Sequence, residues 1–286
     1  MSRPAGRDRR ETPANDRVAA ARLRSEIEAP RYAEPERWRV TRPVTDLLRA
    51  PEGPRERQLV LGEAFELLEM HDGVAFGWAA RDGFVGYVAE AALAADGPAP
   101  THRVAVPASH AYSAPDLKTP ELMGLSFGSE LRVVSAAGGF FETAEGWFVP
   151  RPHLRPLNVP FRDPVTVAQL FFGVPYLWGG NSVWGIDCSG LVQAAWRAAG
   201  LDCPGDSDQQ ERVLGEALPE GTPFQRGDLL FWRGHVALAV DAEVLIHANG
   251  HTMSVAYERI ADAIARIEAQ GEGRPTAHRR MPVGAD

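Results

Sequence analysis

The segment Asp187-Cys188-Ser189-Gly190-Leu191 decides how this 286-residue chain is interpreted. It places one of only two cysteines where a helix is expected to begin, because apolar residues recur at helical spacing from there to Ala199. The N-terminus of a helix carries partial positive charge, which favours the thiolate form of a cysteine. Since the thiolate is the nucleophilic form, Cys188 is a candidate nucleophile.

Two histidines follow in apolar segments that predict strands. The runs 235–240 and 243–247 flank Asp241-Ala242, so a hairpin centred on Asp241 would place His235 opposite His247. Directly opposed residues have Cβ atoms about 4.5–5.5 Å apart. One imidazole can then accept the thiol proton while the other orients the first. The alternative is that a lone cysteine and each histidine are packing residues, the role we expect for Cys203.

Composition limits the possible classes. A hydrophobic content of 44% is ample for a core in two or three domains, and two cysteines are too few for a disulfide framework. A net charge of −8 without a basic block in the ordered region argues against nucleic acid and anionic membranes as partners. No apolar run reaches the ~18 residues of a membrane span. We expect a cytoplasmic monomer, or a periplasmic or secreted one if a leader has been removed.

The chain divides into four parts that differ in composition and hydrophobic pattern. Residues 1–37 predict a disordered tail, which contains the basic stretch Arg3 to Arg10, and then a short helix over Asp16 to Ala29. Residues 38–98 and 99–158 each predict a small β-barrel of short strands with Asp-Gly or Gly-Gly turns. Residues 159–286 predict helices first and an antiparallel sheet after them, which is an α+β arrangement, and Tyr257 to Ala269 predicts a late helix with a polar face.

The motifs of residues 165–255 resemble the NlpC-type papain-like cysteine peptidases, which cleave peptides of the bacterial cell wall. The two preceding barrels resemble the paired SH3-like domains of one branch of that family, so the resemblance covers about residues 38–260. The motifs that carry the resemblance are Tyr176-x-Trp178-Gly179-Gly180, Asp187-Cys188-Ser189-Gly190-Leu191, Gln209 or Gln210, Gly227-Asp228-Leu229, His235-Val236 and Ile246-His247-Ala248.

The resemblance implies a role for each catalytic residue. Cys188 matches the nucleophile, His235 the general base and His247 the polar residue that orients the base. Tyr176 matches a tyrosine whose hydroxyl lies beside the nucleophile, although a loop aromatic of this kind can also simply pack on Trp178. A phenol and the backbone N–H of Cys188 would together stabilise a tetrahedral oxyanion. The resemblance implies no metal and no cofactor.

The branch with two barrels cuts L-Ala–γ-D-Glu–diamino acid peptides with a free amine, between γ-D-Glu and the diamino acid. Asp187 matches a carboxylate that binds the L-Ala ammonium, while Ser189 and Ser207 match positions that hold the D-Glu carboxylate. Asp187 is equally suited to cap the helix that begins at Cys188, and Ser207 to an ordinary loop.

The first barrel of that branch closes the amine end of the site with an acid and a tyrosine. Glu63 resembles the acid, although a strand glutamate is commonly just a solvated charge. The aromatic position falls on Phe84, with Tyr87 three residues on. Phenylalanine leaves packing but no hydroxyl at this position.

The sequence therefore predicts a Cys188 thioester peptidase that recycles small cell-wall peptides. Two alternatives stay open. One is another papain-like amidase or acyltransferase that uses the same thiol. The other is a non-catalytic wall-binding module with a vestigial hydrolase domain, against which the intact Cys188, His235 and His247 argue.

Overall fold

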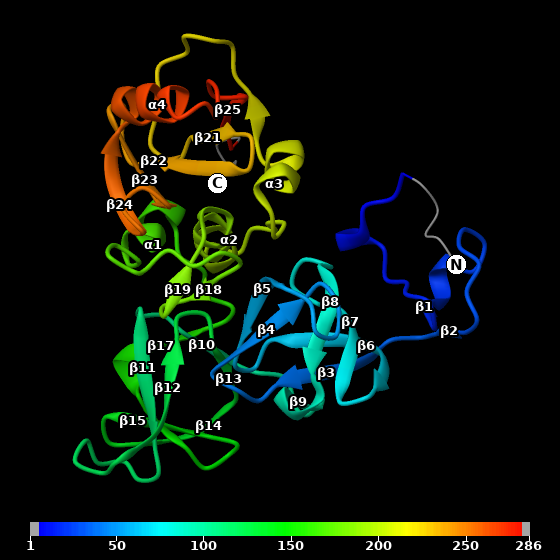
Figure 1. Ribbon diagram of the computed structural model, residues 1–286. Helices are drawn as coiled ribbons and strands as arrows, with labels where there is room; N and C mark the ends of the chain where they lie inside the picture. The colour runs from blue at the N-terminus through cyan, green and yellow to red at the C-terminus, as the bar shows by residue number, and fades with distance from the viewer. Residues whose placement is uncertain (1–5, 282–286) are drawn as a thin grey trace. The chain divides into compact units, whose positions relative to one another are not determined.

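The computed structural model describes residues 6–281, which form two compact units that divide after Leu157 (Figure 1). The first unit is built from β-strands and short 3-10 turns, and the second combines helices with one large sheet. Among the described residues, no helix is long and apolar enough to cross a membrane. Residues 1–5, which include Arg3 of the expected tail, lie outside the described part.

The prediction of a tail and a helix before residue 38 is wrong for the described residues. Two short 3-10 turns and a two-stranded parallel ladder take their place. Val18, Ala20 and Leu23 are buried in one cluster with Phe76 and other residues of the first barrel, so tertiary packing overrides local helix propensity. The elements are η1 (Arg9–Glu11), β1 (Ala19–Ala20), η2 (Ala21–Leu23) and β2 (Tyr32–Ala33).

Residues 36–95 form a seven-stranded antiparallel sheet in the order β5-β4-β8-β7-β6-β3-β9. Leu47, Phe65 and Val88 lie at the centre of its core. The predicted turn at Asp72-Gly73 is present, and both residues have positive φ, as a tight hairpin requires. The strands are β3 (Glu36–Val40), β4 (Val44–Leu48), β5 (Arg55–Val60), β6 (Ala64–His71), β7 (Val74–Ala79), β8 (Val85–Ala89) and β9 (Leu93–Ala95), with η3 (Glu90–Ala92) before the last.

Residues 102–156 form two further sheets around a core that contains Val104, Leu125 and Val149. A 3-10 turn again precedes the final strand, as in residues 36–95. That shared order fits a duplicated barrel, which stays a prediction. The elements are β10 (His102–Val104), β11 (Ala108–Tyr112), β12 (Glu121–Ser126), β13 (Glu130–Leu131), β14 (Val133–Ala137), β15 (Phe140–Thr143), β16 (Phe148–Pro150), η4 (Arg151–His153) and β17 (Leu154–Pro156).

The second unit holds a six-stranded antiparallel sheet in the order β20-β25-β21-β22-β23-β24. The predicted sequence of helices first and sheet after is present. The strands are β18 (Asn181–Ser182), β19 (Gly185–Ile186), β20 (Glu216–Ala217), β21 (Leu229–Trp232), β22 (His235–Ala239), β23 (Val244–Asn249), β24 (Ser254–Arg259) and β25 (Ala277–Arg280); the helices are α1 (Pro164–Gln169), α2 (Cys188–Ala198), α3 (Ser207–Val213) and α4 (Ile260–Ala269).

Helices α2 and α4 are amphipathic and pack on this sheet. Leu191, Ala195 and Trp196 of α2 are at most 1% exposed, and the helix contacts β22 and β23. Burying a side chain the size of leucine contributes about 1.5–3 kcal/mol to the stability of the fold. The apolar contact of α2 with β22 and β23 therefore fixes the position of the N-terminal end of α2. Helix α4 begins at Ile260 rather than at the predicted Tyr257, because residues 254–259 pair with β23 as an edge strand.

Candidate active site

Cys188 is the first residue of α2, and Asp187 fixes the start of that helix. Asp187 has extended backbone geometry, and its Oδ1 accepts the N–H of Gly190 at 2.6 Å. The sulfur of Cys188 lies 4.0 Å from the carbonyl oxygen of Gly234, the residue directly before His235. Gly234 has a φ of +76°, a backbone conformation that glycine adopts without strain, in the tight turn between β21 and β22. The helix tip and the start of β22 therefore meet at the sulfur.

His235 and His247 contact each other, as predicted, but not in the predicted register. The Nε2 atom of His235 and the Nδ1 atom of His247 are 2.9 Å apart. Strand pairing joins Leu238 to Ile246, which extends to place His235 opposite Asn249, with His247 on the adjacent diagonal. The pairing is shifted by two positions from the predicted one, and because side chains alternate along a strand, both rings stay on one face.

A local hydrogen-bond pattern explains that shift. Asp241 Oδ1 accepts the backbone N–H groups of Glu243 and Val244 at 2.8 and 2.9 Å. Such an aspartate-centred turn closes a three-residue connection from Asp241 to Glu243, whereas the predicted hairpin was centred on Asp241. The centre of the hairpin therefore moves from Asp241 to Ala242.

Sequence reasoning missed a charged pair behind the histidines. The Nε2 atom of His247 lies 3.1 Å from Oε2 of Glu258 on β24. Arg266 on α4 donates from Nε to Oε1 of Glu258 at 2.9 Å and from Nη2 to Oε2 at 2.8 Å. This two-pronged contact lowers the pKa of Glu258 to about 2, so the carboxylate is ionised at neutral pH. The sequence signal for this pair is an acid and an arginine eight residues apart, with Glu258 at the end of a strand and Arg266 in the helix that follows.

This pair determines which histidine nitrogens carry protons. An ionised carboxylate has no proton to donate, so the Nε2 atom of His247 beside it is the protonated one. Burial lowers the pKa of His247, so the ring is neutral and its Nδ1 atom is an acceptor. His235 therefore donates from Nε2 to His247, which leaves Nδ1 of His235 to act as the base.

His235 is neutral in the resting site. Burial lowers its pKa to about 3, the His247 and Arg266 charges act in the same direction, and Glu258 acts against them. A neutral imidazole can accept a proton, whereas an imidazolium cannot. When His235 is protonated, the negative charge of Glu258 stabilises the resulting cation through His247. The arrangement is thus suited to general-base activation of a thiol.

Tyr176 lies close enough to Cys188 for their charges to interact. Burial raises the pKa of Tyr176 well above its usual range, and the Cys188 and Asp187 charges raise it further. The hydroxyl therefore stays protonated and can donate a hydrogen bond. The Tyr176 N–H donates to the carbonyl of Met253 at 2.9 Å, which anchors this loop to the turn between β23 and β24.

Asp187, Ser189 and Ser207 are buried around the N-terminal ends of α2 and α3. Asp187 accepts from Gly179 N at 2.9 Å and from Ser189 Oγ at 3.0 Å, so the capping role weighed from the sequence is present. Gln210 donates from Nε2 to the carbonyl of Ser189 at 2.9 Å and ties the two helices together. Whether these groups also bind a ligand stays a prediction.

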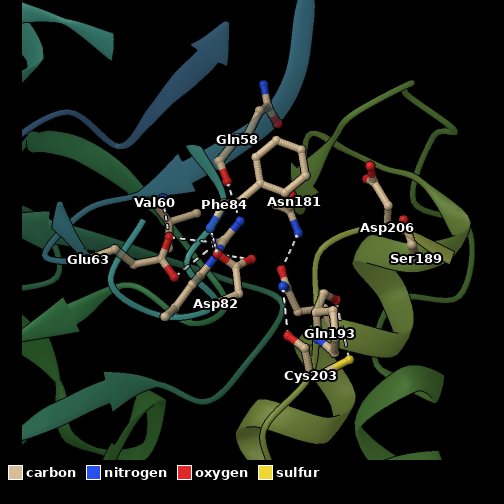
Figure 2. Close-up of polar contacts among 12 residues, drawn as sticks. Gln58, Val60, Glu63, Asp82, Phe84, Asn181, Ser189, Gln193, Cys203 and Asp206 are labelled. Atoms are coloured by element: carbon tan, nitrogen blue, oxygen red, sulfur yellow. Dashed lines mark hydrogen bonds and ion pairs between the residues drawn. The ribbon is translucent and has the colours of Figure 1, made fainter. Parts of the chain in front are cut away.

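Glu63 and Phe84 are part of the first barrel (Figure 2). Glu63 is buried, with its Oε2 accepting from Val60 N at 3.0 Å, and it is paired with Arg81 at 2.8 Å. It is therefore not the solvated charge weighed from the sequence. Phe84 packs in the apolar core. Contact of either residue with a substrate stays a prediction.

Cys203 has the structural role expected from its sequence context. It is 3% exposed, its carbonyl accepts from Gln193 Nε2 at 3.1 Å, and Gln193 in turn accepts from Asn181 (Figure 2). Gln210 Nε2 lies 3.5 Å from its sulfur. Neither cysteine forms a disulfide.

A cysteine at a helix tip and a histidine pair on an adjoining antiparallel sheet define the second unit as a cysteine peptidase domain. Residues 173–268 match the model of the NlpC/P60 family, and residues 47–93 match that of the bacterial dipeptidyl-peptidase Sh3 domain. The chain thus carries an NlpC/P60 cysteine peptidase domain after an SH3 domain of that kind.

Named relatives agree with these matches. The chain is 28% identical to gamma-D-glutamyl-L-lysine dipeptidyl-peptidase of Bacillus subtilis over 58% of this chain and 59% of that one. It is 40% identical to dipeptidyl-peptidase 6 of Lysinibacillus sphaericus over 31% of this chain and 33% of that one. It therefore aligns with less than two thirds of either relative. An NlpC/P60 family protein from Bacillus cereus has the same fold, with a TM-score of 0.72 at 19% identity over 86% of this chain and all of that chain.

The neutral state of His235 predicts a pH-dependent stability. Between about pH 6.5 and pH 3 the unfolded chain binds a proton at this histidine that the folded chain does not, so the free energy of unfolding rises with pH in this window. Wild type should lose about 2–3 kcal/mol more stability than His235→Gln when the pH falls from roughly 7.5 to 4.5, as measured by urea unfolding. The exposed His110→Gln serves as control, and identical pH slopes for wild type and His235→Gln would contradict the prediction.

Removing the charge of Glu258 should weaken the base. We expect Glu258→Gln to slow iodoacetamide alkylation of Cys188 at neutral pH by about tenfold, because the His235 imidazolium loses its distal anion. The acidic limb of the rate profile should move to lower pH, since Glu258 raises the pKa of both histidines. Mass spectrometry of the Cys188 peptide measures the rate. Glu243→Gln, an exposed change on the neighbouring loop, should have no effect; an unaltered profile in Glu258→Gln would refute the role.

Proposed function

We propose that this chain hydrolyses the amide bond between γ-D-Glu and the diamino acid in cell-wall stem peptides with a free N-terminal L-Ala. The observation that carries the proposal is the 2.9 Å contact between His235 and His247 beside the sulfur at the start of α2. The match of residues 47–93 and the names of two relatives support the substrate class.

In the first step, Cys188 Sγ attacks the γ-glutamyl carbonyl carbon and its proton passes to Nδ1 of His235. The cation that forms on His235 is stabilised through His247 by Glu258. The negative charge on the carbonyl oxygen is stabilised by the hydroxyl of Tyr176 and by the N–H of Cys188. That N–H is in the first turn of α2, where backbone donors have no partner within the helix.

In the second step, the tetrahedral intermediate collapses and its C–N bond breaks. His235 gives its proton to the departing amine, which leaves a thioester on Cys188. A water molecule then attacks the thioester carbon, with His235 again accepting a proton. The dipeptide L-Ala–γ-D-Glu is released and the thiol is restored, so acid and base functions alternate on one imidazole.

Recognition of the acyl half is assigned to the helix tips. Asp187 binds the L-Ala ammonium with the carboxylate that caps α2, and Ser189 and Ser207 hold the D-Glu carboxylate. Glu63 and Phe84 of the first barrel are proposed to close the amine end. Such a site suits small peptides, so we place the enzyme in cytoplasmic recycling of cell-wall fragments, acting as a monomer.

Incubation with L-Ala–γ-D-Glu–L-Lys should release L-Ala–γ-D-Glu, detected by mass spectrometry. Cys188→Ala should lower the rate by at least about 10³-fold, because the nucleophile is lost, whereas Cys203→Ala should retain the rate if it folds. N-Acetylation of the L-Ala should abolish cleavage. Equal cleavage of the blocked peptide would favour the amidase or acyltransferase alternative, and inert wild type would favour the wall-binding module.

A further inference from the structure

A cavity of about 370 Å³ lies on one side of His235. Its walls come from the start of β22, from the end of β23 with the turn after it, and from α4 with the loop that follows. Its lining includes Asn249, Arg266 and Glu272. The residues proposed to bind the acyl half lie elsewhere, at the N-terminal ends of α2 and α3.

The reaction itself indicates what should lie there. His235 must protonate the departing amine, so the residue that carries this amine has to pass His235. The acyl half is held at the helix tips, and the cavity begins at His235 and extends away along α4. Under the proposed function, on which this inference rests, the leaving residue is a diamino acid. Its side chain ends in an ammonium group.

The charges around the cavity suit a cation. Arg266 is already neutralised by its two-pronged contact with Glu258, and its Nη1 atom donates to Gln270 at 3.0 Å. Glu272 is exposed, and its negative charge raises the pKa of both Arg266 and Tyr176. Its carboxylate is therefore within electrostatic range of the hydroxyl beside the nucleophile and of the inner wall of the cavity.

We propose that this cavity receives the side chain of the diamino acid and that Glu272 accepts its terminal ammonium. An ammonium paired with a carboxylate makes charge-assisted hydrogen bonds, which are stronger than neutral ones. Lysine and diaminopimelate share this ammonium, so the site recognises the group common to both. Glu272 is accordingly a specificity-determining residue rather than a catalytic one.

The experiment compares L-Ala–γ-D-Glu–L-Lys with the same peptide acetylated on the lysine side chain. Wild type should lose about tenfold in kcat/KM on acetylation, the scale of one charge-assisted contact. Glu272→Gln should lower kcat/KM for the lysine peptide to the same extent and leave the acetylated peptide unchanged. The meso-diaminopimelate peptide should show the same loss as the lysine peptide.

The control is Glu268→Gln, which removes an exposed carboxylate of the same region that lies 3.8 Å from Arg274 and outside the cavity lining. It should affect neither peptide. Equal losses on the lysine and acetylated peptides in Glu272→Gln, or no loss on either, would overturn the assignment. A loss on the lysine peptide without a matching loss on the meso-diaminopimelate peptide would overturn it as well. If wild type cleaves both peptides equally, the proposed function stands and the subsite fails; if it cleaves no stem peptide, both fail.

Discussion

The active site depends on where α2 begins. Asp187 sets that point, because its carboxylate accepts N–H groups from Gly179 and Gly190 and so fixes the approach loop and the first turn together. The apolar face of α2 then holds the helix against β22 and β23. One residue earlier or later, the side chain of Cys188 would rotate by about 100° around the helix axis and leave the histidines. A capping interaction thus controls the position of the reacting atom.

The electrostatics of the site depend on the carboxylate of Glu258, which is separated from the Cys188 sulfur by the two histidines. Both histidines are kept neutral mainly by burial, which would make them poor acceptors of a proton if nothing opposed it. Glu258 opposes it, and Arg266 keeps Glu258 ionised. The pair is half-buried, with about a fifth of each side chain exposed, so removing one member leaves the other only partly compensated by water. The pair of Glu258 and Arg266 therefore does two things. It joins α4 to β24, and it favours the protonated form of the histidine pair.

The sequence predicted those parts of the site that local chemistry determines. The helix at Cys188 follows from an aspartate cap and apolar spacing, and the shared face of His235 and His247 follows from strand alternation. The exact pairing did not follow, because the side chain of Asp241 closes a loop that is centred on Ala242. Glu258 and Arg266 were missed because the expected helix began at Tyr257, which put both on one polar face. The helix predicted over Asp16 to Ala29 was wrong for the opposite reason. Val18 and Leu23 favour a helix locally, but the first barrel supplies the surface that buries them.

The two carboxylates predicted to meet the substrate amine differ in how their charge is used. The donors to Asp187 described above are backbone N–H groups and a hydroxyl, all neutral, so they stabilise its negative charge without cancelling it. Glu63 is paired with the guanidinium of Arg81, which does cancel it. Moving Arg81 away would leave a buried, unpaired carboxylate, at a cost of several kcal/mol. Under the proposed function, attraction of the ammonium would rest chiefly on Asp187, while Glu63 and its partner Arg81 hold the β5 end and the loop after β7 together within the first barrel.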